Sequence, residues 1–272
     1  MRALLARVGP AAAAGAAGLL QALALAWPGT GQPLWWLQLA SLAVLAGLLQ
    51  RQGGWLGAAL VGWSFATAWL TGTFWWLYIS MHVYGGLAAP LAALAVLLLA
   101  AFLALDYALA SALFSRGRRG RAWLDGALFA ALWTGAELMR GTFYTGFPWG
   151  AGGYAHVDGP LAALAPWVGV YGIGALAAWL AWLLAQAVQR PALASWRYWL
   201  LVGGSAGLVA ACNVHTAASP PAAPGPKLRV GLLQGNIPQD EKFEGGTGIP
   251  VALQWYAQRL RDTNAQLVVA PE

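Results

Sequence analysis

Long apolar stretches, separated by short polar segments, make up most of the sequence as far as residue 213. A helix needs about 20 apolar residues to cross the hydrocarbon core of a bilayer, and seven stretches reach or approach that length. They predict helices over residues 11–27, 34–49, 55–79, 87–114, 122–139, 161–188 and 198–212. We therefore expect residues 1–213 to form a polytopic α-helical membrane bundle.

The pattern changes after the seventh stretch. Residues 214–226 combine small residues with repeated prolines, which predicts an extended linker. The sequence then predicts a strand at "LRVGLLQ", a helix from the spacing of Leu253, Tyr256 and Leu260, and a strand at "LVVAPE". Strand, helix and strand in this order open an α/β fold with a parallel sheet, and residues 227–272 are too few to complete one. We expect a truncated N-terminal fragment of such a domain.

Composition and charge agree with a membrane protein. Of the 272 residues, 60% are hydrophobic and 9% are charged, whereas soluble domains carry roughly 25% charged residues. The formal charge of +6 comes from short basic clusters between apolar stretches, not from a continuous basic face, so we expect no nucleic-acid partner. The single cysteine, Cys212, excludes an internal disulfide, and we interpret it as a small apolar residue of the seventh helix.

The distribution of arginines predicts the orientation of the bundle. If the N-terminus is cytoplasmic, nine arginines fall on the cytoplasmic side and one, Arg140, falls on the other. Seven spans then deliver residues 227–272 outside the cytoplasm. The nine are Arg2, Arg7, Arg51, Arg116, Arg118, Arg119, Arg121, Arg190 and Arg197.

Two stretches on the side opposite the arginines are rich in aromatic residues and glycine. They are "TGTFWWLYISMHVYGG" (71–86) and "ELMRGTFYTGFPWGAGGY" (137–154). One interpretation is an aromatic belt, since Trp and Tyr favour the headgroup level of a membrane. The other is a shaped wall for a lipid, because glycines allow close backbone approach and Pro148 fixes a turn between Phe147 and Trp149.

Ionisable residues in or near the apolar stretches are further candidates. Glu137 and Arg140 lie three residues apart, on one helix face, and could pair, either to bind substrate or to anchor the following loop. Asp106, deeper in the fourth stretch, predicts a polar contact with another helix more than a catalytic role. His82 and His156 are too few and too far apart in sequence to predict a metal site.

Glu272 follows an apolar strand and Pro271. The C-terminal ends of parallel strands are where α/β folds assemble active sites, and a carboxylate there can act as a general base.

Taken together, the apolar bundle, the two aromatic stretches, "GPLAALAPWVGVYG" (159–172), "QGNIPQ" (234–239) and "VVAPE" closely resemble the bacterial apolipoprotein N-acyltransferases, of which this sequence covers the N-terminal part. The resemblance implies a membrane bundle carrying an extracytoplasmic domain of the nitrilase (carbon–nitrogen hydrolase) type, in the inner membrane. It also implies transfer of a fatty acyl chain from a phospholipid to the N-terminal amine of a diacylglyceryl-cysteine lipoprotein, through a cysteine thioester and without a cofactor.

The same resemblance assigns candidate residues. Glu272 matches the family's general base, and Phe243 stands where the family usually has a tryptophan at the lipid entrance. Phe147, Trp149, Glu137 and Arg140 are expected to contact substrate. The family's lysine and nucleophilic cysteine lie beyond the glutamate, so we expect this polypeptide alone to be inactive.

Two other functions stay open. One is a non-catalytic membrane interaction or scaffold protein, or a relic, because the nucleophile is absent from these residues. The other is a transporter. The sequence shows no obvious internal repeat and few charges near the middle of the spans, and both features argue against a transporter.

Overall fold

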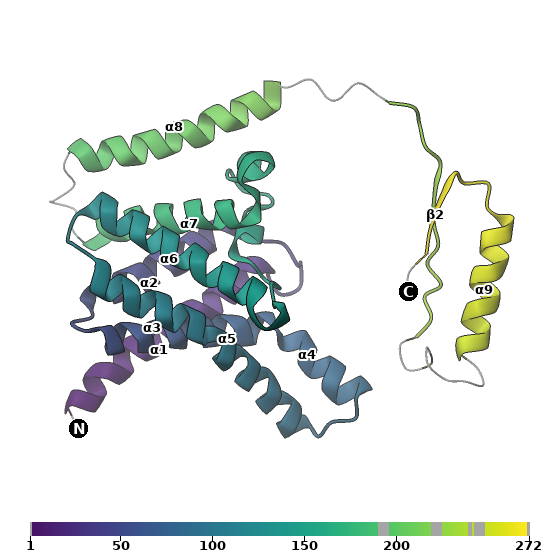
Figure 1. The fold of residues 1–272 in the computed structure, drawn as a ribbon, viewed down its shortest axis with the longest axis horizontal. Helices are drawn as coiled ribbons and strands as arrows, with labels where there is room; N and C mark the ends of the chain where they lie inside the picture. The colour runs from purple at the N-terminus through teal and green to yellow at the C-terminus, as the bar shows by residue number, and fades with distance from the viewer. Residues whose placement is uncertain (1, 190–195, 219–224, 239–240, 242–247, 271–272) are drawn as a thin grey trace. The chain divides into compact units, whose positions relative to one another are not determined.

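The computed structural model describes residues 2–189, 196–218, 225–238, 241 and 248–270. These residues fall into two compact units: the helices α1 to α8, and the strands β1 and β2 with helix α9 (Figure 1). The described chain is mostly helical.

The seven long helices of the first unit form close to where the apolar pattern places them. They are α1 (Arg2–Leu25), α2 (Trp35–Arg51), α3 (Trp55–Thr73), α5 (Ala89–Gly117), α6 (Ala122–Thr142), α7 (Ala165–Gln189) and α8 (Trp196–Ala218). Within the described residues, three segments combine the length and hydropathy of a membrane span: Ala89–Gly117, Ala162–Val188 and Trp196–Thr216. Several apolar helices are thus compatible with a membrane bundle, and the number of crossings stays a prediction.

Two expected helices are interrupted. The third was expected to run to residue 79, but Phe74 leaves the helical conformation (φ −97°, ψ 14°), and a short helix α4 (Trp75–Ile79) and a π-helical turn η1 (Ser80–Tyr84) follow. The sixth was expected from residue 161, but a 3-10 turn η4 (Ala162–Leu164) comes first, and Gly169 kinks α7 with φ 62° and ψ −173°. In the other direction, α8 continues to Ala218, into the expected linker.

Six of these helices follow one another around a closed ring. In order of contact they are α1, α3, α5, α6, α7 and α2, which returns to α1. Helix α8 contacts α7 and η4 from outside this ring, where Cys212 packs against an apolar cluster containing Leu161 and Leu164, as expected of a small apolar residue. The ring places the ends of helices that are distant in sequence next to one another.

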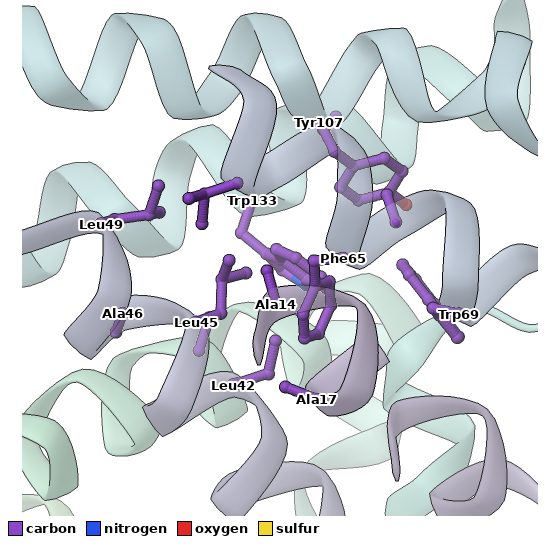
Figure 2. Close-up of a cluster of buried hydrophobic side chains, with 14 of the residues drawn as sticks. Ala14, Ala17, Leu42, Leu45, Ala46, Leu49, Phe65, Trp69, Tyr107 and Trp133 are labelled. Atoms are coloured by element: carbon purple, nitrogen blue, oxygen red, sulfur yellow. The ribbon is translucent and has the colours of Figure 1, made fainter. Parts of the chain in front are cut away.

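Aromatic side chains fill the middle of the ring. Trp69 stacks on Trp133 with ring centroids 5.5 Å apart, and Tyr107 lies edge-on to Trp69 at 5.4 Å (Figure 2). Small residues permit close helix contact around this cluster: a Cβ at Gly18 of α1 would collide with the backbone carbonyl of Phe65 in α3. The outer surface is also apolar, with exposed leucines along α5, as expected where lipid is the solvent.

The second unit is a strand–helix–strand segment. Strand β1 (Val230–Leu232) pairs in parallel with β2 (Leu267–Val269), and α9 (Gly248–Asp262) connects them. The expected order and the parallel pairing are confirmed, although both strands are shorter than expected. The hydroxyl of Tyr256 in α9 accepts a 3.0 Å hydrogen bond from the backbone N–H of Gly235 and so joins the helix to the loop after β1.

Candidate functional site: an aromatic wall and its buried clamp

The two aromatic-rich stretches meet in the structure. Phe74 packs edge-on against Phe147 with centroids 4.8 Å apart, and Trp76 packs edge-on against Trp149 at 5.8 Å. We call these four residues the aromatic wall. Phe74 is fully buried, whereas 59% of Trp149 is exposed, so the wall has one side anchored in the ring of helices and one side open.

A tight reversal of the chain after α6 builds the second half of this wall. Tyr144, Thr145 and Gly146 have φ values of 53°, 73° and 80°, and the first two are unusual for residues with a side chain. The reversal lets the N–H of Phe147 donate to the carbonyl of Arg140 at 2.8 Å. Strained backbone of this kind persists only where the surroundings hold it.

Arg140 is the first of the groups that hold the loop. Its Nη1 donates to the carbonyl oxygens of Phe147 at 2.6 Å and Trp149 at 2.8 Å, and its Nε donates to the hydroxyl of Tyr107 at 3.1 Å. The guanidinium also lies over the ring of Trp69, 5.6 Å from the centroid. A buried charge is tolerated only with such partners, and here the partners are the backbone of the wall.

Glu137 holds the loop at a second point. Its Oε1 accepts a 2.7 Å hydrogen bond from the N–H of Gly152, and Nε2 of Gln38 in α2 donates to the carbonyl of the same residue at 2.6 Å. Gly152 opens the 3-10 turn η3 (Gly152–His156), which contacts α1, α2 and α7. Both peptide groups of Gly152 are thus fixed by side chains from two different helices.

The expected pairing of Glu137 with Arg140 is wrong. Both side chains lie on the buried face of α6, as their spacing predicts, but among the described residues no ion pair joins them. Each reaches backbone groups of the loop instead, because the reversal at Tyr144–Gly146 presents carbonyls to Arg140 and the Gly152 N–H to Glu137. Of the two roles left open by the sequence, this geometry favours anchoring of the loop.

Two glutamines complete a buried polar cluster that the sequence reasoning missed. Gln21 of α1 and Gln38 of α2 are fully buried, and a Cβ built on Gly152 would lie 2.6 Å from Nε2 of Gln38, 3.2 Å from Oε1 of Glu137 and 3.5 Å from Nε2 of Gln21. Oε2 of Glu137 faces Gly174 of α7, where a Cβ would lie at 2.9 Å. A polar residue inside an otherwise apolar helix was the available signal. We call the three residues that bond to the loop, Glu137, Arg140 and Gln38, the clamp.

The remaining ionisable candidates lie around the wall and clamp without joining them. His156 is 1% exposed, and burial lowers the pKa of its imidazole to about 4. His82 contacts the carbonyl of Leu87 through Nδ1 at 2.8 Å and packs beside Tyr78. Asp106 of α5 lies beside Arg140 of α6 and Tyr144 in a pocket of about 100 Å³, and its carboxylate interacts electrostatically with the Arg140 guanidinium, as expected of a polar contact with another helix.

Phe243 and Glu272 lie outside the described residues, so their roles stay predictions. Strand β2, which precedes Glu272 in the sequence, ends at Val269. The structure therefore describes the wall and its clamp in the bundle, together with the strand that leads toward the predicted base.

Comparison with known proteins covers nearly the whole chain. Residues 17–183 match the family described as the apolipoprotein N-acyltransferase N-terminal domain. An apolipoprotein N-acyltransferase of Verminephrobacter eiseniae is 58% identical over 271 residues, covering 94% of this chain and 50% of the relative. Relatives of the same name from Ralstonia nicotianae and Nitrosomonas europaea are 49% and 36% identical, covering 88% and 87% of this chain and 45% and 46% of their own lengths.

The chain thus spans about half the length of the curated relatives that it matches. The match includes the stretches that form the wall and the clamp, because both lie within residues 17–183. From this coverage and identity, the chain belongs to the apolipoprotein N-acyltransferase family.

Proposed function

We propose that this chain forms the membrane-embedded half of an enzyme that transfers an acyl chain from a phospholipid to the N-terminal amine of a diacylglyceryl-cysteine lipoprotein. The observation that carries the proposal is the 58% identity to a relative of that name over 94% of the chain. The bundle would lie in the inner membrane with a cytoplasmic N-terminus, and residues 227–272 would begin a nitrilase-like domain on the opposite side. No cofactor is required by this chemistry.

The reaction that the family resemblance implies has two acyl transfers. Glu272 takes the proton of a cysteine thiol, the thiolate attacks the ester carbonyl, and the lysophospholipid oxygen leaves with a proton, which produces a thioester. The lipoprotein amine then attacks the thioester, the thiolate leaves, and the amine proton returns to the base. That cysteine, and the lysine that stabilises the oxyanion, are not among these 272 residues, since Cys212 lies in α8.

For this chain, the proposed contribution is positioning. Trp149 and Trp76 present exposed aromatic surface suited to an acyl chain or a headgroup, and Arg140 and Glu137 hold the loop that carries Trp149. Holding a reactant in one reactive geometry removes a large part of the free-energy barrier to reaction. A wall can do this only if it is rigid. Glu137 and Arg140 are therefore proposed to act through the loop, and Phe147, Trp149 and Phe243 to face lipid.

A photo-crosslinking experiment tests the role of the wall. A photoreactive phenylalanine at position 149 should capture phospholipid acyl chains in nanodiscs more efficiently than the same group at Trp196, an exposed tryptophan at the start of α8. Equal capture at both positions would favour the aromatic belt.

Acyl transfer itself is tested by joining residues 1–272 to the C-terminal half of the Verminephrobacter eiseniae relative and measuring N-acylation of a diacylglyceryl peptide. A folded but inactive fusion would support the scaffold alternative.

A further inference from the structure

Gln21 of α1 lies beside the clamp but makes no hydrogen bond to it. None of its surface is exposed, and neither Oε1 nor Nε2 has a hydrogen-bond partner among the described residues. Burying an amide without partners forfeits the hydrogen bonds that it makes with water in the unfolded chain, which is costly. A fully buried amide of this kind therefore points to a ligand at its end.

Two side chains of the clamp also have unpaired atoms. Oε1 of Gln38 and Oε2 of Glu137 are buried and accept no hydrogen bond within the described chain, although the other end of each group is bonded to Gly152. The side chains of Gln21, Gln38 and Glu137 converge, since atoms of all three lie within 3.5 Å of the position of a Cβ built on Gly152. Three helices, α1, α2 and α6, thus direct unpaired polar groups toward one place.

The kinds of unpaired atom identify the ligand. A water molecule donates two hydrogen bonds and accepts others, and a buried water typically makes about three. Here Nε2 of Gln21 can donate to a water, which can donate in turn to Oε1 of Gln38 and Oε2 of Glu137. A metal cation would leave Nε2 of Gln21 unpaired. Glycines border the site and keep side-chain carbon out of it: a Cβ at Gly174 would lie 2.9 Å from Oε2 of Glu137.

We propose that one water molecule binds between Gln21, Gln38 and Glu137 and joins α1 to the loop after α6. The clamp already holds Gly152 at its N–H and its carbonyl, from α6 and α2. The water adds α1, which also contacts the turn η3 that Gly152 opens. The proposal concerns how the loop is held and does not depend on acyl transfer.

A crystal structure of the full 272-residue chain, grown from a lipidic phase in sodium salt, tests the site directly. A density peak should lie at hydrogen-bond distance, about 2.6–3.2 Å, from Nε2 of Gln21, Oε1 of Gln38 and Oε2 of Glu137. It should stay the same when rubidium replaces sodium. An anomalous signal from rubidium at this place would identify a cation site and overturn the proposal. Direct contact between Gln21 and Glu137, with no density between them, would also overturn it.

Variants of Gln21 test the same site in nanodiscs, without crystals. Gln21→Met keeps the length of the side chain and removes its hydrogen bonds, so amide exchange in residues 152–156 should accelerate by about fivefold, the effect of losing one hydrogen bond. Exchange in α5 should not change. Gln50→Met, a matched change near the other end of α2, should leave residues 152–156 at the unmodified rate. Unchanged exchange in Gln21→Met, or acceleration spread equally over α5, would overturn the proposal.

A second variant separates the amide donor from the size of the side chain. Gln21→Glu keeps the size of Gln21 but replaces the Nε2 donor with an oxygen, beside an oxygen of Glu137. Exchange in residues 152–156 should accelerate at least as much as in Gln21→Met. Protection equal to that of the unmodified chain would show that the donor is not needed, which would overturn the proposal. Monodisperse elution of each variant checks that it is folded.

Discussion

The carboxylate of Glu137 and the backbone N–H of Gly152 are joined by a 2.7 Å hydrogen bond in the interior of the bundle. Gly152 belongs to the loop after α6, and its carbonyl accepts a second hydrogen bond from Gln38 of α2. One residue therefore ties α2, α6 and the loop together through its two flanking peptide groups. Arg140, one turn further along α6, binds the carbonyls of Phe147 and Trp149, so a single helix holds the loop at two points.

The first prediction concerns this hydrogen bond. Glu137→Ala removes the acceptor and leaves the N–H of Gly152 buried without a partner, which costs about 1–3 kcal/mol of unfolding free energy. Glu137→Gln keeps an oxygen in place and should cost less. Denaturant unfolding in detergent measures both. Asp158→Ala, at an exposed position of the same loop, is the control and should change stability by less than about 0.5 kcal/mol. A Glu137→Ala protein as stable as this control would contradict the clamp.

The second prediction concerns Arg140. Arg140→Lys keeps the charge but loses the planar fork that serves two carbonyls and the Tyr107 hydroxyl at once. Hydrogen bonds to charged groups are worth about 1.5–3 kcal/mol, so amide exchange in residues 143–156 should accelerate by about tenfold or more. Hydrogen-exchange mass spectrometry measures this. Arg116→Lys should leave that segment unchanged, and equal exchange in both variants would show that Arg140 does not hold the loop.

Much of the helical framework could be predicted from the sequence, because in lipid the apolar length of a segment largely decides whether it spans. The strand–helix–strand order could also be predicted, since it follows from local spacing. The break at Phe74 could not: no proline or glycine occupies that position, and the residue is held by burial against Phe147, a contact across 73 positions of sequence.

The site shows the same division between local and long-range causes. The shared face of Glu137 and Arg140 follows from helix geometry, but their actual partners depend on where the next loop returns. That return is set by the left-handed backbone at Tyr144 and Thr145, where the residue types carry little signal. Gln38 acts on Gly152, 114 residues away, and nothing in its own neighbourhood identifies that partner.

The third prediction is a dependence of stability on pH through His156. Burial lowers the pKa of this imidazole to about 4 in the folded protein, from an ordinary value near 6.5. Between these two values the unfolded chain binds a proton and the folded chain does not. Stability is therefore unaffected by this group above pH 6.5 and falls as pH drops from about 6.5 toward 4, by at most about 3 kcal/mol.

His156→Phe should remove this loss, measured by unfolding at pH 7 and pH 5. His82→Gln should retain it, and an unchanged pH dependence in His156→Phe would contradict the assignment.

The fourth prediction concerns orientation. The nine-to-one distribution of arginines predicts that the loop after α5 is cytoplasmic and the loop after α6 is not. In a Cys212→Ala background, single cysteines at Ser115 and at Asp158 should react with an impermeant maleimide from opposite sides of the inner membrane, with Asp158 accessible from outside in intact spheroplasts. Labelling of both positions from one side would show that α6 does not cross the membrane, and opposite-side labelling with Ser115 accessible from outside would reverse the proposed orientation.

The last prediction concerns Glu272, the residue that the family resemblance assigns as the general base. The resemblance places the nucleophilic cysteine outside residues 1–272, so these residues alone should form no acyl-thioester from phospholipid. When it is joined to the C-terminal half of the Verminephrobacter eiseniae relative, Glu272→Gln keeps the size of the side chain and removes the base. Loss of a general base lowers rates by about 10²–10⁴-fold, so thioester formation should fall by at least about 100-fold while the protein inserts and elutes normally. Glu241→Gln, at an exposed position of the same unit, should react at the unmodified rate. Thioester formation that survives Glu272→Gln would assign the base elsewhere, whereas loss in both variants would indicate a folding defect in the fusion.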